Sequence, residues 1–411
     1  MPAYIARQIE PLIVSAATEY SAVLVTGPRQ VGKSTVITHA LEGLEASVER
    51  LTLDDLDLRR LAKEDPALFF QLHEPPVFID EVQYAPELFS QMKILIDAGA
   101  PAGSFWLSGS QQFALMELAG ETLAGRIAII ALSSLSAREI SGDPAAGRLS
   151  IELSALKDRT GMSTPLSARE LFERIWQGAM PAVINGSRTN LSLFYSSYIQ
   201  TYIERDVRRL LGNVDAMMFS DFMRAAAARC SQLLNVAAIA EDVQIRPEKA
   251  KEWLSVLERS GIIFYLHPYS NNQLKRTVKA PKLYFHDCGL VAHLARWTSP
   301  ESLEAGAMAG AFVENYVVSE ICKGFINEGI QPPLYYYRDR DAKEIDVVIE
   351  SDGRLHPLEI KKTASPNKGM TSAFSVLNRS AIPRGEGAVI CLAERLSALD
   401  AETFVIPIWA L

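Results

Sequence analysis

The first third of the chain alternates short apolar runs with amphipathic segments. Buried strands are predicted at 21–26 (SAVLVT), 75–83 (PPVFIDEVQ) and 104–110 (SFWLSGS), and a further strand follows Arg126 in ETLAGRIAII. The segment STVITHALEGL, after the first strand, has the apolar spacing of a helix. Apolar strands that alternate with helices are typical of an α/β fold built on a parallel sheet.

The middle of the chain is predicted to be mainly helical. Residues 141–169 are rich in Gly, Ser, Pro and Thr and predict a loop that leaves the first domain. Helical segments follow up to residue 211. Over 235–266 the pattern predicts two amphipathic helices around a turn at 245–247, with a strand after Gly261. The apolar positions of these two helices are Ile239, Val243, Ala250, Trp253, Leu254 and Leu257.

A basic hairpin is predicted next, in NNQLKRTVKAPKLYFH (271–286). Together with the two helices before it, this hairpin resembles the wing of a winged helix. Its cations are Lys275, Arg276, Lys279 and Lys282. Such cations favour contact with the phosphate backbone of DNA. A winged helix that only packs, with its lysines in solvent, is the open alternative.

The last third is predicted to contain a helix over 311–325 and strands over 335–350 and 355–363. Asp352–Gly353, between the two strands, is a typical hairpin turn. The region therefore predicts a helix packed beside a β-hairpin.

Polar residues interrupt these elements in a pattern that suggests chemistry. Asp346 lies on the first strand, while Glu359 and Lys361 lie two apart on the second and so share one face. With Glu314 on the helix, the order matches the restriction-endonuclease-like pattern. A Mg²⁺ site is predicted from Asp346, Glu359 and Glu314, with Lys361 stabilising the attacking water or the developing charge. Solubilising residues on an inactive copy of this fold are the alternative.

Length and composition limit the class of protein. A chain of 411 residues is too long for one core, and the predicted domains are 1–140, a helical lid or linker region at 141–220, a winged-helix domain at 221–298 and an endonuclease-like domain at 299–411. Hydrophobic content of 48% and charged content of 22% describe a globular protein. No apolar run approaches the ~18 residues of a membrane span. The four cysteines are widely spaced, so neither disulfides nor a zinc site is predicted, and a cytoplasmic location is expected.

The net charge of −8 is unevenly distributed. Residues 1–140 carry 10 Lys and Arg against 18 Asp and Glu, a net of −8, whereas residues 221–295 carry 10 against 7, a net of +3. The chain as a whole is therefore not a DNA-coating protein, because non-specific affinity needs clustered cations. A local basic surface in the middle third is compatible with these counts.

The stretch GPRQVGKST, after the first strand, fits the pattern G-x-x-x-x-G-K-[ST]. Its glycines let backbone amides surround phosphate oxygens, and the following helix offers its positive N-terminal end. Lys33 is predicted to reach the β- and γ-phosphates, and Ser34 to ligate Mg²⁺. The predicted nucleotide-binding residues are Gly27, Pro28, Arg29, Gln30, Val31, Gly32, Lys33, Ser34 and Thr35. ATP and Mg²⁺ are the predicted cofactors.

Two further strands end in polar residues. Asp80 and Glu81 follow an apolar strand, and this predicts Mg²⁺ coordination by Asp80 and water polarisation by Glu81. The next strand ends in small hydroxyl residues, of which Ser110, in preference to Ser108, is predicted to sense the γ-phosphate. Helix N-capping by the two acids is the alternative for the first pair, and a plain turn for the second.

Arg126 precedes the last strand of this region. It could act as an arginine finger on the nucleotide of a neighbouring subunit, or as a partner in a structural salt bridge. The finger interpretation requires an assembly, so a homo-oligomer compatible with a hexameric ring is expected.

Several segments together resemble a largely uncharacterised family of bacterial and archaeal ATPases. They are YIARQIEPLI, VLVTGPRQVGKST, VFIDEVQYAPELF, FWLSGSQQF, LAGRIAIIALSSLS, WQGAMPAVI, YSSYIQTYIERDVRRL and KAPKLYFHDCGLVAHL. The resemblance implies an AAA-type P-loop sheet, a helical lid, a winged-helix segment and a conserved C-terminal region of unknown function. Ser34 stands where Thr is common in the family, and Gln111 where Ser is usual.

Two hypotheses about function follow. In the first, an oligomeric ATPase couples its nucleotide state to a DNA-handling module with a nuclease-like domain. In the second, an ATP-driven switch or self-assembling ATPase uses its C-terminal domains as protein-interaction surfaces and cuts no nucleic acid. The two differ in whether Asp346, Glu359 and Lys361 bind metal and in whether DNA is bound in a salt-dependent way.

Overall fold

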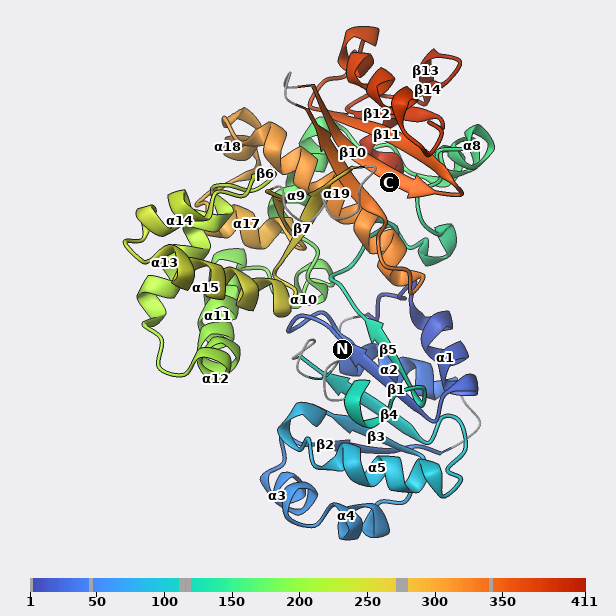
Figure 1. Cartoon of the computed structure of the whole chain (residues 1–411), viewed down its shortest axis with the longest axis vertical. Helices are drawn as coiled ribbons and strands as arrows, with labels where there is room; N and C mark the ends of the chain where they lie inside the picture. The colour runs from blue at the N-terminus through green and yellow to red at the C-terminus, as the bar shows by residue number, and fades with distance from the viewer. Residues whose placement is uncertain (1–2, 44–46, 111–114, 116–119, 271–279, 340–342) are drawn as a thin grey trace.

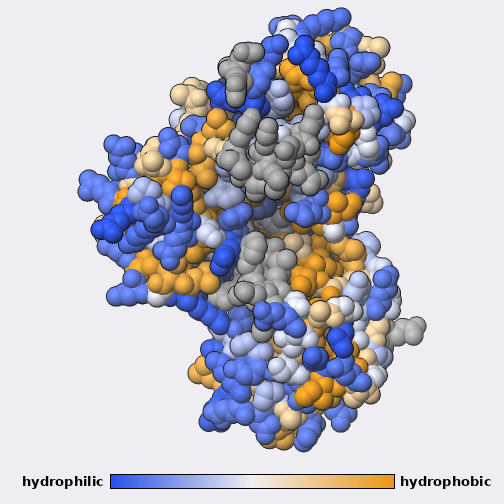
Figure 2. All heavy atoms as spheres, in the orientation of Figure 1, coloured by the Kyte–Doolittle hydropathy of each residue, from blue (hydrophilic) through white to orange (hydrophobic). Residues whose placement is uncertain are grey.

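The computed structural model describes residues 3–43, 47–110, 115, 120–270, 280–339 and 343–411. Figure 1 shows three parts, an N-terminal domain at the bottom, a helical middle region at the left and a C-terminal sheet at the top. On the face drawn in Figure 2, hydrophilic and hydrophobic residues are interspersed over all three parts. Among the helices that the structure describes, none has both the length and the apolar character needed to cross a lipid bilayer.

The N-terminal domain is built on a five-stranded sheet in the order β2-β3-β4-β1-β5, and all four pairings are parallel. Its strands are β1 Ala22–Thr26, β2 Glu49–Thr52, β3 Val77–Asp80, β4 Phe105–Gly109 and β5 Ile127–Ala131. Its helices are α1 Glu10–Glu19, α2 Lys33–Glu42, α3 Leu56–Glu64, α4 Pro66–Leu72, α5 Leu88–Asp97 and α7 Ala137–Ile140. The predicted parallel α/β sheet is confirmed.

Both faces of this sheet are covered, which explains why its central strands are apolar throughout. Val23 and Val25 belong to the core that includes residues of α1 and α2. Ala22 and Leu24, which alternate with them, belong to the core formed with α4 and α5. Side chains of a strand point alternately to its two faces, so every position of β1 is buried.

The middle region is a group of helices. They are α9 Ala168–Gln177, α10 Pro181–Ile184, α11 Leu191–Tyr202, α12 Arg208–Leu211, α13 Ala216–Ala227, α14 Val236–Asp242 and α15 Pro247–Arg259, with a π-helical segment at Ile203–Val207. Helix α8 Leu153–Met162 precedes them in the chain but lies beside the C-terminal sheet (Figure 1), where Arg159 donates to the Ala410 carbonyl at 2.7 Å. The prediction of a loop over 141–169 was wrong at its centre, because α8 occupies 153–162 and buries Leu156 and Arg159. The two predicted amphipathic helices are confirmed as α14 and α15, and Trp253 of α15 packs on Phe219 and Phe222.

The C-terminal part contributes to a nine-stranded sheet in the order β13-β14-β12-β11-β10-β9-β7-β8-β6. The strands are β6 Gln232–Leu233, β7 Ile263–Pro268, β8 Lys282–Phe285, β9 Leu334–Arg338, β10 Glu344–Ser351, β11 Arg354–Lys361, β12 Gly387–Cys391, β13 Ser397–Asp400 and β14 Thr403–Pro407. Helix α19 Ala309–Asn327 packs against β8 and β11 of this sheet, whereas α17 Cys288–Leu294 and α18 Pro300–Ala305 pack against α9 of the middle region.

Two details of this sheet differ from the sequence prediction. The single strand predicted over 335–350 is two antiparallel strands, β9 and β10, and Asp339 and Lys343, which directly follow β9 and precede β10, bond to each other. The sheet also continues through the predicted boundary at 298/299, since β7 pairs with β9. The hairpin turn at Asp352–Gly353 is confirmed, with φ +51° and +68°.

Candidate functional site

The nucleotide-binding loop lies between β1 and α2, at the carboxyl edge of the first sheet. Gly27 adopts φ +150°, and Gly32, directly before α2, adopts φ +92°. A Cβ atom at Gly27 would lie 2.1 Å from the carbonyl oxygen of Leu132. Only glycine therefore lets the loop pass so close to this backbone.

Arg7, which precedes the first sheet in the chain, holds this loop in place through hydrogen bonds. Its guanidinium donates hydrogen bonds of 2.8 Å to the carbonyl oxygens of Val31 and Ser133 and forms a buried ion pair with Glu139 at 3.0 Å. Sequence reasoning missed Arg7 because its carbonyl partners lie 24 and 126 residues away.

Lys33 is buried within the loop, with 7% of its surface exposed. Its ammonium donates to the carbonyl oxygens of Gly27 at 3.1 Å and Pro28 at 2.8 Å. Burial lowers the pKa of Lys33 to about 8, although the negative charge of Glu81 acts to raise it. A buried ammonium bound only to backbone carbonyls is well suited to bind an anion such as a phosphate.

The pKa of Lys33 predicts a pH dependence of ATP binding. Phosphate oxygens favour the charged ammonium, so ATP raises this pKa and binding takes up a proton above about pH 8. We expect the affinity for ATP to fall above that pH, approaching about tenfold per pH unit. The measurement is the Kd of ATP as a function of pH. Lys33→Arg keeps its charge and should lose the dependence, whereas a flat wild-type profile would contradict the assignment.

Asp80, at the end of β3, lies between two hydroxyl groups. The Ser34 Oγ donates to the Asp80 carboxylate at 2.8 Å, and the Ser108 Oγ donates to the same oxygen. A carboxylate and a hydroxyl next to Lys33 are the groups that Mg²⁺ bound to a nucleotide requires. These residues therefore fit the predicted cofactors, ATP and Mg²⁺.

Glu81 and Ser110 are linked by a residue that the sequence analysis did not select. Gln83, 4% exposed, donates through Nε2 to the Glu81 carboxylate and, at 3.3 Å, to the Ser110 hydroxyl. Glu81 adopts the left-handed conformation, with φ +57°, which is uncommon outside glycine and recurs at functional sites. Glu81, predicted to polarise water, and Ser110, predicted to sense the γ-phosphate, thus lie close together at the carboxyl ends of β3 and β4.

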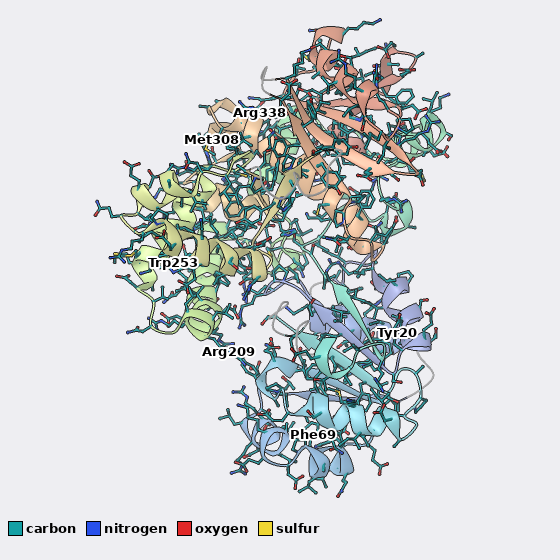
Figure 3. All side chains as sticks on the ribbon, in the orientation of Figure 1. Tyr20, Phe69, Arg209, Trp253, Met308 and Arg338 are labelled. Carbon is teal, nitrogen blue, oxygen red and sulfur yellow. The ribbon has the colours of Figure 1, made fainter. Side chains whose placement is uncertain are left out.

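The middle region forms the other wall of this site. A cleft of about 1000 Å³ is lined by loop residues including Arg29, Lys33 and Ser34, and by residues 181–205 of the middle region. Arg29 forms an ion pair with Asp206 of the π-helical segment, with a second bond of 2.9 Å. Arg209 donates to the Gln83 carbonyl at 2.7 Å, and Figure 3 shows it where the helical region approaches the first domain.

Arg126 lies away from this cleft. It directly precedes β5, so it is at the amino edge of the parallel sheet, opposite the loop of its own chain. Its guanidinium binds Asp97 at 2.7 Å, and both side chains are over a third exposed. Arg126 therefore does not contact the nucleotide site of its own chain, and the finger interpretation stays a prediction about a neighbour.

The acids predicted to bind Mg²⁺ in the C-terminal region also lie close together, but lysine side chains lie among them. Lys361 binds Glu359 at 2.6 Å and Asp346 at 3.3 Å, and the Ile360 amide donates to Asp346 at 2.9 Å. Burial, followed by the charge of Asp346, raises the pKa of Glu359 to about 7. Burial also raises the pKa of Glu314.

Lys282 departs from the prediction that it contacts DNA. Lys282 is 4% exposed and binds Glu314 at 3.1 Å and Glu344 at 2.7 Å. A side chain so enclosed cannot reach a phosphate backbone, so its assignment to a basic DNA-binding surface was wrong. Lys275, Arg276 and Lys279 lie outside the residues that the structure describes, as does Gln111.

The fold and the first site define a P-loop ATPase of the AAA type. Residues 19–141 match the family described as "AAA domain". Residues 168–301 match "Domain of unknown function (DUF8612)", and residues 309–411 match "Domain of unknown function (DUF4143)". An AAA domain implies ATP binding, typically with Mg²⁺, and ATP hydrolysis.

The chain is 30% identical over 357 residues to "Uncharacterized protein Rv2008c" of Mycobacterium tuberculosis and to "Uncharacterized protein Mb2031c" of Mycobacterium bovis. Each match covers 86% of this chain and 73% of the mycobacterial protein. This chain therefore belongs to the same family as these two proteins.

Likeness to solved structures is weaker. The Walker-type ATPase PABY2304 of Pyrococcus abyssi has a TM-score of 0.45 at 16% identity, with 71% of this chain and 96% of that one covered. The RuvB Holliday junction branch migration motor of Thermotoga maritima has a TM-score of 0.30 at 16% identity, with 62% and 86% covered. At these scores neither structure adds to the functional assignment.

Proposed function

We propose that this protein is an ATP-driven switch in which the middle region responds to the nucleotide. Lys33 binds the β- and γ-phosphates, while Ser34 and Asp80 hold Mg²⁺, which neutralises phosphate charge when bound. Glu81 accepts a proton from the attacking water, and Gln83 orients Glu81 through its side-chain amide. Ser110 is placed by the same amide to contact the γ-phosphate.

One observation supports the switch above all. The nucleotide cleft is lined both by the loop and by residues 181–205, and the loop residue Arg29 is paired with Asp206. A nucleotide that enters the cleft adds phosphate charge within reach of Arg29, and this charge competes with Asp206 for the guanidinium. ATP binding and the position of the π-helical segment are thereby coupled.

Hydrogen exchange of the backbone amides tests this coupling. We expect Mg²⁺-ATP to change exchange in residues 181–211 as well as in the loop, and the Lys33→Ala variant to lose both changes. Protection of the loop with no change in residues 181–211 would contradict the switch.

We further propose that the switch acts on DNA, through the middle and C-terminal regions. This proposal is supported by the meeting of Asp346, Glu359 and Lys361 on adjacent strands, in the predicted order. The alternative, that these regions bind proteins and cut no DNA, is supported by the burial of Lys282 among the same acids.

A cleavage assay separates the two. Wild type is compared with Asp346→Ala on linear, circular and single-stranded DNA, with Mg²⁺ and with or without ATP. Glu350→Gln, on the same strand but outside the cluster, is the matched control. Cleavage lost only in Asp346→Ala supports a nuclease, and no cleavage of any DNA supports the interaction surface.

Homo-oligomerisation is also proposed, because an arginine finger requires a neighbouring subunit, and a hexameric ring is one form compatible with it. The position of Arg126 at the exposed amino edge of the sheet supports it. The mass of the protein in solution with Mg²⁺-ATP tests the assembly, because a single-chain mass under these conditions would contradict it.

A cytoplasmic setting is proposed because all four cysteines are free and buried.

A further inference from the structure

Lys282 connects the middle region to the carboxylates of the C-terminal region. It begins β8, and its ammonium reaches Glu314 on α19 at 3.1 Å and Glu344 on β10 at 2.7 Å. Asp346 lies 3.9 Å away on the same strand β10. An ammonium has three N–H donors and accepts no hydrogen bond; Glu314 and Glu344 are within hydrogen-bond distance of it, and Asp346 adds negative charge nearby.

The neighbours of Lys282 fix this arrangement. Tyr284, two residues further along β8 and therefore on the same face, donates its hydroxyl to Glu314 at 2.6 Å. Arg338, labelled in Figure 3, lies 3.6 Å from Glu344. Burial alone would lower the pKa of Lys282, but the attraction of Glu314 and Asp346 raises it above its ordinary value. Lys282 is thus held as a cation.

The cluster does not fit a divalent metal as it is arranged. Among the residues that the structure describes, no group of three or more His, Cys, Asp or Glu side chains is placed to hold a metal ion. A metal bound by Glu314 and Asp346 would need oxygens that now face the Lys282 ammonium, and the two cations would repel each other. The buried Glu359 Oε2 has no hydrogen-bond partner among the described residues, but a single oxygen cannot form a metal site alone.

We propose that Lys282 is an internal counter-ion that takes the place of the divalent metal between Glu314 and Asp346. The middle region, through β8, then holds the acids of the C-terminal sheet together by charge. Any metal-dependent chemistry at this cluster requires Lys282 to leave first. The inference rests on the position of β8 and not on ATP hydrolysis.

Mn²⁺ binding in the absence of nucleotide tests this proposal, with bound and free ion separated by electron paramagnetic resonance. The proteins are wild type, Asp346→Asn, Lys282→Met, Lys282→Arg and the double variant Lys282→Met/Asp346→Asn. We expect Lys282→Met to gain one bound Mn²⁺ per chain and the double variant to lose it. Lys282→Arg, which keeps the charge, should gain none. ATP hydrolysis by Lys282→Met should equal that of wild type, because Lys282 is not in the nucleotide cleft.

Two results would overturn the proposal. One is a wild-type protein that already binds a Mn²⁺ ion that Asp346→Asn removes. The other is a folded Lys282→Met variant that gains no Mn²⁺. If Lys282→Met does not fold, the comparison of wild type with Asp346→Asn decides alone. Because the proposal has Lys282 occupy the position of the metal, both proteins should then bind the same amount of Mn²⁺.

Discussion

Glu81→Gln should lower the kcat of ATP hydrolysis by roughly 10²–10⁴-fold, the usual contribution of a general base. Glutamine keeps the size of the side chain but cannot accept a proton from water. ATP should still bind, because Lys33 and Ser34 are unchanged. The measurements are steady-state phosphate release and the Kd of ATP.

The exposed neighbour Glu87 provides the matched control. Glu87→Gln removes the same charge six residues along the chain and should hydrolyse ATP like the wild type. A wild-type kcat in Glu81→Gln would show that Glu81 is not the general base, and Gln83 and Ser110 would be the next residues to test.

Asp206→Ala should have the largest effect on stability and on coupling. It leaves the Arg29 guanidinium, 15% exposed as a side chain, without its charge partner. Breaking a buried pair from one side typically costs about 3–5 kcal/mol, and we expect the lower end because Arg29 borders an open cleft. Denaturant unfolding gives the loss of stability, and hydrogen exchange should show that residues 181–211 no longer respond to ATP.

The double variant Arg29→Ala/Asp206→Ala distinguishes pairing from other effects. Removing both partners should recover part of the lost stability, as expected for two interacting side chains. The exposed pair Asp221 and Arg224 is the control, and Asp221→Ala should cost less than about 1 kcal/mol. Equal losses in Asp206→Ala and Asp221→Ala would contradict a special role for the Arg29 pair.

The nucleotide site was largely predictable because its residues are either contiguous or follow strand ends. The loop from Gly27 to Thr35 is one uninterrupted motif, and β1, β4 and β3 are neighbours in the sheet. Parallel strands bring their carboxyl ends to one edge, which is why Ser34 and Asp80, 46 residues apart, were expected to be close and lie 2.8 Å apart.

The contacts between regions were not predictable in this way. Asp206 lies 177 residues from Arg29, and no periodicity or motif connects the two. Lys282 was misassigned because lysine is seldom buried and because Glu314 and Glu344 belong to different elements. One signal was overlooked: the polar run between Arg338 and Glu344 has the composition of a turn and should have divided the strand predicted over 335–350.

Phosphate release from Mg²⁺-ATP by the purified full chain, wild type beside Lys33→Ala, tests the central claim most directly. We predict steady release by the wild type and none by Lys33→Ala, with both proteins showing the same circular dichroism spectrum. Absence of release by a folded wild type, or equal release by both proteins, would contradict the assignment of this cleft as an ATP-hydrolysing site.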